Sequence, residues 1–149
     1  MSNNEWAKVL PVHEVLRELW FEYDEHLDRG PIVAHFRFDS LSVYVNVCPD
    51  DDTIELANEP KAPFTVFRKI NVSDSEYWKP LIGRVLSWTH VMINNQGYQN
   101  GVSFGFANEQ TSEVSSVMLV AGCSTLSVYQ VQNRSARLNF GERALYENQ

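Results

Sequence analysis

Apolar and polar residues alternate along much of this chain, which is the pattern of β-strands that turn one side to a core. The period of two is clearest over residues 32–38 and 41–47, and the Asp39-Ser40 pair between these runs predicts a hairpin. The apolar side chains then share one side of the hairpin. The other side takes His35, Arg37, Ser42, Tyr44 and Asn46.

The chain before this hairpin changes its period near Leu19. Between residues 9 and 16 the apolar positions recur at mixed three- and four-residue spacing, so we expect a short helical turn over residues 12–17. From Leu19 onward the period is two, which predicts a strand. Its apolar side holds Leu19, Phe21 and Tyr23, and its polar side holds Glu18, Trp20, Glu22 and Asp24.

After the turn CPDDDT, residues 53–57 predict another short strand, and residues 58–80 are the least regular part of the chain. Three prolines interrupt that part, and Ser73 followed by Glu76 has the form of a capping box. We therefore expect a short helix over residues 74–79, in a segment that covers an end or an edge of the sheet.

Apolar runs in the second half predict strands over residues 84–93, 102–106, 114–121 and 125–131. The first run is apolar on both sides, which predicts a central strand or a strand that lines two layers, with His90 in the interior. The whole pattern predicts a mostly β fold: an antiparallel sandwich or open barrel of about seven to eight strands with one or two short helices. We expect residues 1–149 to form a single domain, because a chain of this length can bury about 70% of its unfolded surface.

The charge of the chain is acidic, with 12 Lys plus Arg against 19 Asp plus Glu and a net charge of -7. No cluster of cations is present to neutralise phosphates, so nucleic acid is not expected as a partner, and a basic partner suits the charge better. No secretory signal precedes the first polar residues, and no apolar run approaches the ~20 residues of a membrane span. We expect a cytoplasmic protein without membrane association, in which Cys48 and Cys123 are reduced.

Candidate catalytic and metal-binding groups are few. Residues 50–52 with Glu55 lack the spacing of a calcium loop and indicate a solvated turn, and the four His residues show no zinc spacing. Cys123 beside Ser124, with His90 as base, is the best nucleophile available, but strand followed by strand is the wrong context for a nucleophile elbow. We therefore predict no cofactor, no metal and no catalytic residue, and a protein that is not an enzyme.

The octapeptide NNQGYQNG, residues 94–101, lies between two apolar runs and predicts the tip of a hairpin. Asn100-Gly101 is a strong turn signal, and Gly97 supplies a second position that tolerates positive φ. A turn does not account for Gln96 and Tyr98, so a contact surface is the alternative.

The segment WKPLIGRVLSWTHVMINNQGYQNGVSFGF and the later AGCSTLSVYQV resemble an uncharacterised bacterial family, domain-of-unknown-function family 6334. Its members share a Trp-x-Pro-Leu-Ile-Gly segment and an Asn-Gln-Gly-Tyr-x-Asp/Asn-Gly loop, which here are residues 78–83 and 95–101. Asn100 stands at a position where family members have aspartate as often as asparagine. The resemblance covers most of residues 15–132. It implies a small, mostly β protein of the kind encoded singly or near toxin and defence genes, and it implies no activity.

The leading hypothesis is a non-enzymatic binding protein of the immunity type, which occludes a basic toxin with an acidic face. Large aromatics among carboxylates are typical of protein contacts, although a second layer over Trp20 and Tyr44 is an equal alternative. A small-ligand module that uses residues 94–101 and a homo-oligomeric structural protein are the other hypotheses. The candidate contact residues are Glu18, Trp20, Glu22, Asp24, Tyr44, Gln96, Tyr98 and Asn100.

Overall fold

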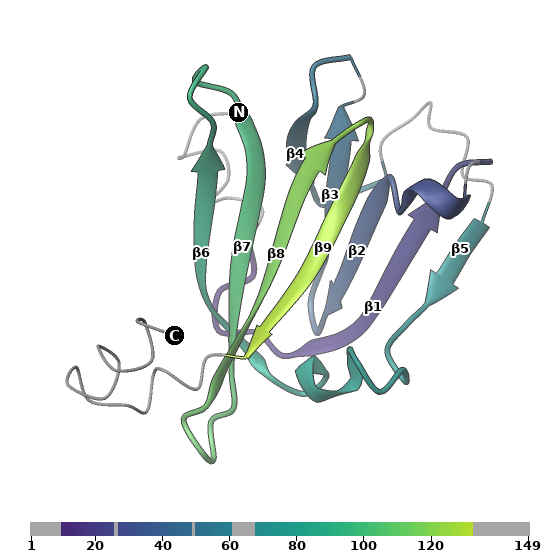
Figure 1. The fold of residues 1–149 in the computed structure, drawn as a ribbon. Coiled ribbons are helices and arrows are strands. Elements are labelled where there is room, and N and C mark those ends of the chain that lie inside the picture. Colours follow the sequence, from purple (N-terminus) through teal and green to yellow (C-terminus); the bar gives the residue numbers. More distant parts are fainter. Residues whose placement is uncertain (1–9, 26, 49, 61–67, 133–149) are drawn as a thin grey trace, which may run out of the picture.

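The computed structural model describes residues 10–25, 27–48, 50–60 and 68–132. Within these residues nine strands form two antiparallel sheets that pack on each other, which confirms the predicted mostly β sandwich (Figure 1). The helical elements of the described part are two 3₁₀ helices, η1 (Leu27–Arg29) and η2 (Lys79–Leu81). No described helix has the length and apolar content that a membrane span requires.

The five-stranded sheet has the strand order β4-β3-β2-β1-β5. The predicted hairpin is the pair β2–β3, and Phe38 closes its turn by donating its N–H to the carbonyl oxygen of Leu41 at 2.9 Å. The strands are β1 (Leu16–Tyr23), β2 (Val33–Phe38), β3 (Ser42–Cys48), β4 (Thr53–Ala57) and β5 (Arg68–Asn71).

The four-stranded sheet follows chain order, β6-β7-β8-β9, so each neighbouring pair is a hairpin. All four strands lie where the apolar runs predicted them, with ends that differ by a few residues. They are β6 (Val85–Ile93), β7 (Gln99–Ala107), β8 (Val114–Gly122) and β9 (Thr125–Gln132).

The core lies between the two sheets and is built from the inward side of each alternating run. Phe36 of β2 is 1% exposed, and its ring centroid lies 5.3 Å from that of Phe104 and 6.1 Å from that of Phe106, both on β7. Leu19 and Val45 of the first sheet and Leu119 of the second are fully buried in the same cluster. Since burial of one such side chain is worth about 1.5–3 kcal/mol, this core holds the two sheets together.

The predicted helical turn over residues 12–17 is wrong, because this segment leads directly into β1. Val15 forms a β-bridge with Val85, and Leu16 donates its N–H to the carbonyl oxygen of Arg84 at 2.8 Å. Leu16 is fully buried. Pairing with the start of β6 satisfies the backbone and buries Leu16, while Val12 stays 48% exposed, so the helical spacing does not produce a helix.

The predicted helix over residues 74–79 is also wrong. Ser73, the expected capping residue, is buried, and its Oγ accepts the N–H of Leu19 at 2.9 Å. Ser75 instead accepts the N–H of Trp78 at 3.2 Å, within a series of turns that leads to η2. The pattern also failed to predict β5, which extends the sheet beyond β1.

The strand predicted to be central, β6, lies at the edge of its sheet, and His90 on it is exposed. Trp88 and Met92 explain the misleading pattern, because both lie on the outer side of the sheet over glycines of β7. A Cβ atom at Gly105 would collide with the Trp88 ring, and one at Gly101 would collide with Met92. The two glycines therefore let large apolar side chains lie flat on the outside.

The outer side of the four-stranded sheet has no described Lys, Arg, Asp or Glu in its three central cross-strand rows. The register aligns these rows across the sheet, and side chains in successive rows on one side are two residues apart along each strand. We call this surface the uncharged face: Trp88, Gly105 and Ser116; His90, Ser103, Met118 and Tyr129; Met92, Gly101, Val120 and Ser127.

Candidate functional site

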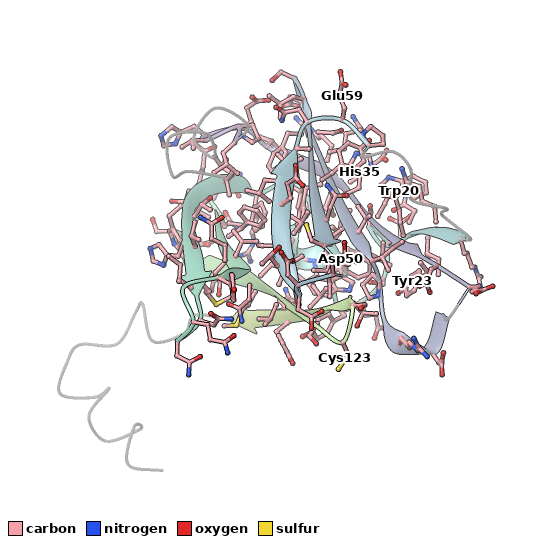
Figure 2. All side chains as sticks on the ribbon, turned by 90° about the horizontal axis from the view of Figure 1, so that it is seen from above. Trp20, Tyr23, His35, Asp50, Glu59 and Cys123 are labelled. Carbon is pink, nitrogen blue, oxygen red and sulfur yellow. The ribbon has the colours of Figure 1, made fainter. Side chains whose placement is uncertain are left out.

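The outer side of the five-stranded sheet collects the candidate residues of β1 and β3 on one surface. The register places Trp20 beside His35 and His35 beside Tyr44, and Figure 2 shows Trp20 and His35 together. In the next row Glu22 pairs with Lys69 of β5. We call this surface the polar face, whose polar and aromatic members include Glu18, Trp20, Glu22, His35, Arg37, Ser42, Tyr44, Asn46, Glu55 and Lys69.

Four residues of the polar face are buried although they point away from the core. Glu22 and His35 are each 7% exposed, Tyr44 is 8% exposed and Asn46 is 1% exposed. Trp20 is half-buried. The predicted outward orientation of Trp20 and Tyr44 is thus confirmed, and of the two environments considered for them, burial holds for Tyr44. Burial of polar groups on the side of a sheet away from its core requires an explanation.

His35 joins several members of the polar face. Its Nε2 lies 2.8 Å from Oγ of Ser42, its Nδ1 lies 3.1 Å from Nζ of Lys69, and its ring stacks on Tyr44 with centroids 4.1 Å apart. Because an ammonium group only donates, Nδ1 accepts from Lys69 and Nε2 carries the ring proton. Burial first, and the charge of Lys69 second, lower the pKa of His35 from 6.5 to about 4.

Acid is therefore expected to destabilise the protein through His35. The folded chain keeps the ring neutral down to about pH 4, whereas the unfolded chain binds a proton below about pH 6.5. The unfolded state takes up more protons in this window, so the free energy of unfolding should fall as the pH falls, by on the order of 2 kcal/mol. Urea unfolding at stepped pH values measures this slope.

His35→Gln should flatten that slope, and His90→Gln, at an exposed histidine, is the matched control that should keep it. The raised pKa of Glu22 acts in the opposite direction, because the folded chain then holds its proton to higher pH than the unfolded chain. The difference between the slopes of wild type and His35→Gln gives the contribution of His35 to the pH dependence of the free energy of unfolding. Equal slopes for wild type and His35→Gln would contradict a neutral, buried His35 ring.

Trp20 is fixed in place by two charged neighbours. Its Nε1 donates to Oε2 of Glu18 at 2.7 Å, and Nζ of Lys69 lies 5.1 Å from the centroid of its ring. Arg37 donates to the other oxygen of Glu18 at 2.9 Å. The hydrogen bond from Arg37, followed by the one from Trp20, lowers the pKa of Glu18. The aromatic ring is therefore presented in one orientation, with a carboxylate that is already paired.

Glu22 is the buried acid of the polar face. Burial raises its pKa, and the charge of Lys69 opposes this effect. Burial also raises the pKa of Tyr44, and the neighbouring Glu22 adds to that shift. Glu22 therefore interacts electrostatically with Lys69 on β5 and with Tyr44 on β3. A buried carboxyl group with one cation nearby gains further stabilisation when another cation approaches it.

Asn46 is the clearest anomaly of the polar face. In the part of the chain that the structure describes, neither Nδ2 nor Oδ1 of this 1%-exposed residue has a hydrogen-bond partner. Thr89 and Gln130 each have only one such atom. A side-chain amide can donate two hydrogen bonds and accept two, and leaving buried groups of this kind unpaired costs about 1–3 kcal/mol. The amide of Asn46 is therefore an unsatisfied polar group of the polar face, and an outside partner reaches it only when the groups that cover it move.

The comparison with known proteins identifies a family but no function. The model of a family of unknown function, DUF6334, matches residues 10–135. The chain belongs to this family. The match spans β1 to β9 and confirms the resemblance seen in the sequence. No curated protein and no solved structure matches the chain.

In this DUF6334 protein the eight candidate contact residues fall into two groups. Glu18, Trp20, Glu22 and Tyr44 share the polar face, and Asp24 follows β1 and is half-buried. The other group belongs to the β6–β7 hairpin of the opposite sheet: Gln96, Tyr98 and Asn100. The two groups therefore do not form a single site.

The turn of the β6–β7 hairpin is made by Asn94 and Gly97 rather than by residues 100–101, which lie within β7. Oδ1 of Asn94 accepts the N–H groups of Gln96 and Tyr98, each at 3.0 Å, and Gly97 has a φ of +86°. The Asn100-Gly101 turn is thus a wrong prediction, while the hairpin itself is confirmed. The side chains of Gln96 and Tyr98 are exposed, and the hydrogen bonds of the turn use only the backbone of these two residues.

Asn94→Ala is expected to destabilise the DUF6334 protein by about 1 kcal/mol, because two backbone N–H groups of the turn lose their acceptor. Asn95→Ala, at the exposed neighbouring asparagine, is the matched control and should change the free energy of unfolding by less than about 0.5 kcal/mol. Urea unfolding of both variants measures the difference. An equal effect of the two substitutions would show that Asn94 does not organise the turn.

The metal and nucleophile candidates do not assemble into a site. Over the described ranges, no group of three or more His, Cys, Asp or Glu side chains could hold a metal ion. Oδ1 of Asp52 accepts the N–H of Ser124 at 2.8 Å, so this acidic turn ties the β3–β4 connection to the β8–β9 turn. Cys123 is exposed in the β8–β9 turn (Figure 2), whereas His90 lies in a central row of the sheet.

Sequence reasoning did not assign three central residues of the site, His35, Asn46 and Lys69. His35 and Asn46 were correctly placed on the outward side of their strands. Alternation predicts which side of a strand a residue faces, but it does not predict that an outward residue is buried. Lys69 lies on β5, whose four residues RKIN include one apolar side chain. The signal that could have identified the first two is an outward histidine and asparagine beside Tyr44 on adjacent predicted strands.

Proposed function

We propose that this DUF6334 protein is a non-enzymatic binding protein that takes its partner on the polar face. The observation that carries this proposal is the buried amide of Asn46, whose donor and acceptor are both unpaired. A fold retains such a cost most readily where another molecule supplies the missing hydrogen bonds. The fixed ring of Trp20 and the buried carboxyl group of Glu22 supply further contacts beside it.

The partner that fits this chemistry best is a basic segment of a protein. A peptide group offers one donor and one acceptor, which matches the two unpaired functions of the Asn46 amide. The polar face carries three carboxyl groups, those of Glu18, Glu22 and Glu55, against the cations of Arg37 and Lys69. The whole chain has a net charge of -7, which accelerates association with a positively charged molecule.

The finer role that we propose is that of a cytoplasmic immunity-type protein, which occludes a basic toxin by steric and electrostatic means. The acidic charge and the resemblance to proteins encoded near toxin genes support it. The second candidate is a small polar ligand bound by the same groups, because His35, Glu22 and Tyr44 have shifted pKa values and lie together, as in many ligand sites.

Co-purification from the native host at low salt, with mass spectrometry of the bound molecules, tests this proposal. Wild type should retain a basic protein that salt releases, and Asn46→Leu should not retain it. Ser127→Ala, on the uncharged face, is the control that should retain it. Recovery of a small molecule that depends on Asn46 would support the second candidate, and equal recovery of every partner by wild type and Asn46→Leu would overturn both.

A further inference from the structure

We infer that a cleft between the start of β6 and the β7–β8 connection binds a free α-amino acid, whose carboxylate pairs with Arg84 and whose ammonium group faces Glu109. The cleft has a volume of about 450 Å³, within the roughly 300–1,000 Å³ of small-molecule sites. It lies at the end of the sandwich where the start of β6 pairs with the end of β7 (Figure 1). One wall is Pro80 with residues 82–84, and the other is residues 108–110. This site is independent of the polar face and of the function proposed for it.

Arg84 gives this cleft a cation that has no close counter-charge among the described residues. Its side chain is only 13% exposed, and within the described ranges its guanidinium makes one hydrogen bond, to Oγ of Ser115 at 2.9 Å. The nearest described carboxylate, that of Glu113, lies 3.9 Å away, which is beyond hydrogen-bond distance. Burial lowers the pKa of Arg84, because it disfavours the charged form. A guanidinium has five N–H donors, so most of them are available to a carboxylate in the cleft.

The acids around Arg84 decide which anion fits. Glu109 is exposed on the other wall of the cleft, and Glu113 lies beside the guanidinium. These carboxylates, and the net charge of -7, repel a multiply charged anion such as phosphate. A zwitterion brings an ammonium group together with its carboxylate, so it pairs with Arg84 without adding net negative charge. Pro80 and the half-buried Ile82 supply apolar contacts for the side chain of the amino acid.

Hydrogen bonds hold both walls of the cleft in place before a ligand binds. On one wall Arg84 donates its backbone N–H to the carbonyl oxygen of Leu81 at 3.1 Å. On the other wall Oδ1 of Asn108 accepts the N–H of Gln110 at 3.0 Å, and the N–H of Asn108 donates to the carbonyl oxygen of Glu113 at 2.7 Å. Walls that are already ordered lose little conformational entropy when a ligand binds, so a small ligand can bind with measurable affinity.

NMR of the isotope-labelled full chain, titrated with the L-amino acids one at a time up to about 10 mM, tests the inference. At least one of them should shift the backbone signals of residues 82–84 and 108–110, with a dissociation constant between about 10 µM and 1 mM. Arg84→Gln should raise that constant roughly tenfold or more, because the carboxylate loses its cation. Arg17→Gln removes an exposed guanidinium that is paired with Asp39, and it should bind as wild type does.

Glu109→Gln keeps the test valid if Arg84→Gln folds poorly, because Glu109 is exposed. It should weaken binding of the amino acid and strengthen binding of propionate, which has a carboxylate but no ammonium group, whereas Glu59→Gln, at another exposed acid, should change neither. Equal affinity of wild type and either cleft variant for the amino acid would overturn the inference. So would binding of propionate or phosphate where no amino acid binds, or an amino acid that shifts only the polar face, which would leave the function proposed for that face intact. A wild type whose cleft signals respond to no amino acid would overturn it as well.

Discussion

Asn46→Leu is expected to make the protein more stable and, at the same time, unable to hold its partner. Leucine has the same γ-branch and the same number of side-chain heavy atoms as asparagine, so it places apolar groups where the amide stands. Removing the unpaired amide should raise the free energy of unfolding by about 1–2 kcal/mol. For a chain of this size such a gain raises Tm by roughly 3–8 °C. Urea and thermal unfolding of both proteins measure the change.

Asn95→Leu is the matched control for this substitution, because Asn95 is exposed at the β6–β7 turn. Its effect on the free energy of unfolding should stay within about 0.5 kcal/mol of zero. If Asn46→Leu instead lowered the free energy of unfolding by more than about 1 kcal/mol, the amide would be paired in the folded protein. Asn46 would then be a structural residue, and the main argument for binding at the polar face would be lost.

Phe36→Ala is expected to have the largest effect on stability, a loss of about 3–5 kcal/mol. Phe36 is 1% exposed and contacts Phe104 and Phe106 across the two sheets, so its removal leaves a cavity where the sheets are joined. A loss of this size is a large part of the roughly 5–15 kcal/mol that stabilises a typical domain. Urea unfolding at neutral pH measures it.

The control for the core substitution is Tyr98→Ala, which truncates an aromatic side chain that is 51% exposed on the opposite hairpin. It should change the free energy of unfolding by less than about 0.5 kcal/mol. A loss below about 1 kcal/mol for Phe36→Ala would contradict the packing of the two sheets described above, because so small a value is typical of a side chain outside a core.

Strict alternation predicted the β2–β3 hairpin correctly, because each inward position there is apolar and, apart from Val33, each outward position is polar, aromatic or small. The same reasoning failed for β6. Trp88 and Met92 are outward but apolar, so β6 resembled a central strand although it is an edge strand. Periodicity reports which positions are apolar, and it does not tell a core from an apolar outer surface.

The candidate site was predicted in part for a related reason. The side of each strand followed from alternation, which placed Glu18, Trp20, Glu22 and Tyr44 correctly on outward sides. Their assembly into one surface depends on β2 lying between β1 and β3, and on β5 pairing with β1. These pairings join segments that are far apart in the sequence, so local alternation does not predict them. The burial of Asn46 and the pKa of His35 depend on that assembly and cannot be read from the residues alone.

The measurement that tests the central claim most directly is NMR of the Asn46 side-chain amide, as the isotope-labelled protein is titrated with the partner fraction that salt releases. Binding at the polar face predicts that both Nδ2 proton signals shift, because the amide gains hydrogen bonds, together with backbone signals of β1 and β3. If the partner binds and shifts only residues 94–101 or the uncharged face, with the Asn46 signals unchanged, the polar face is not the binding site.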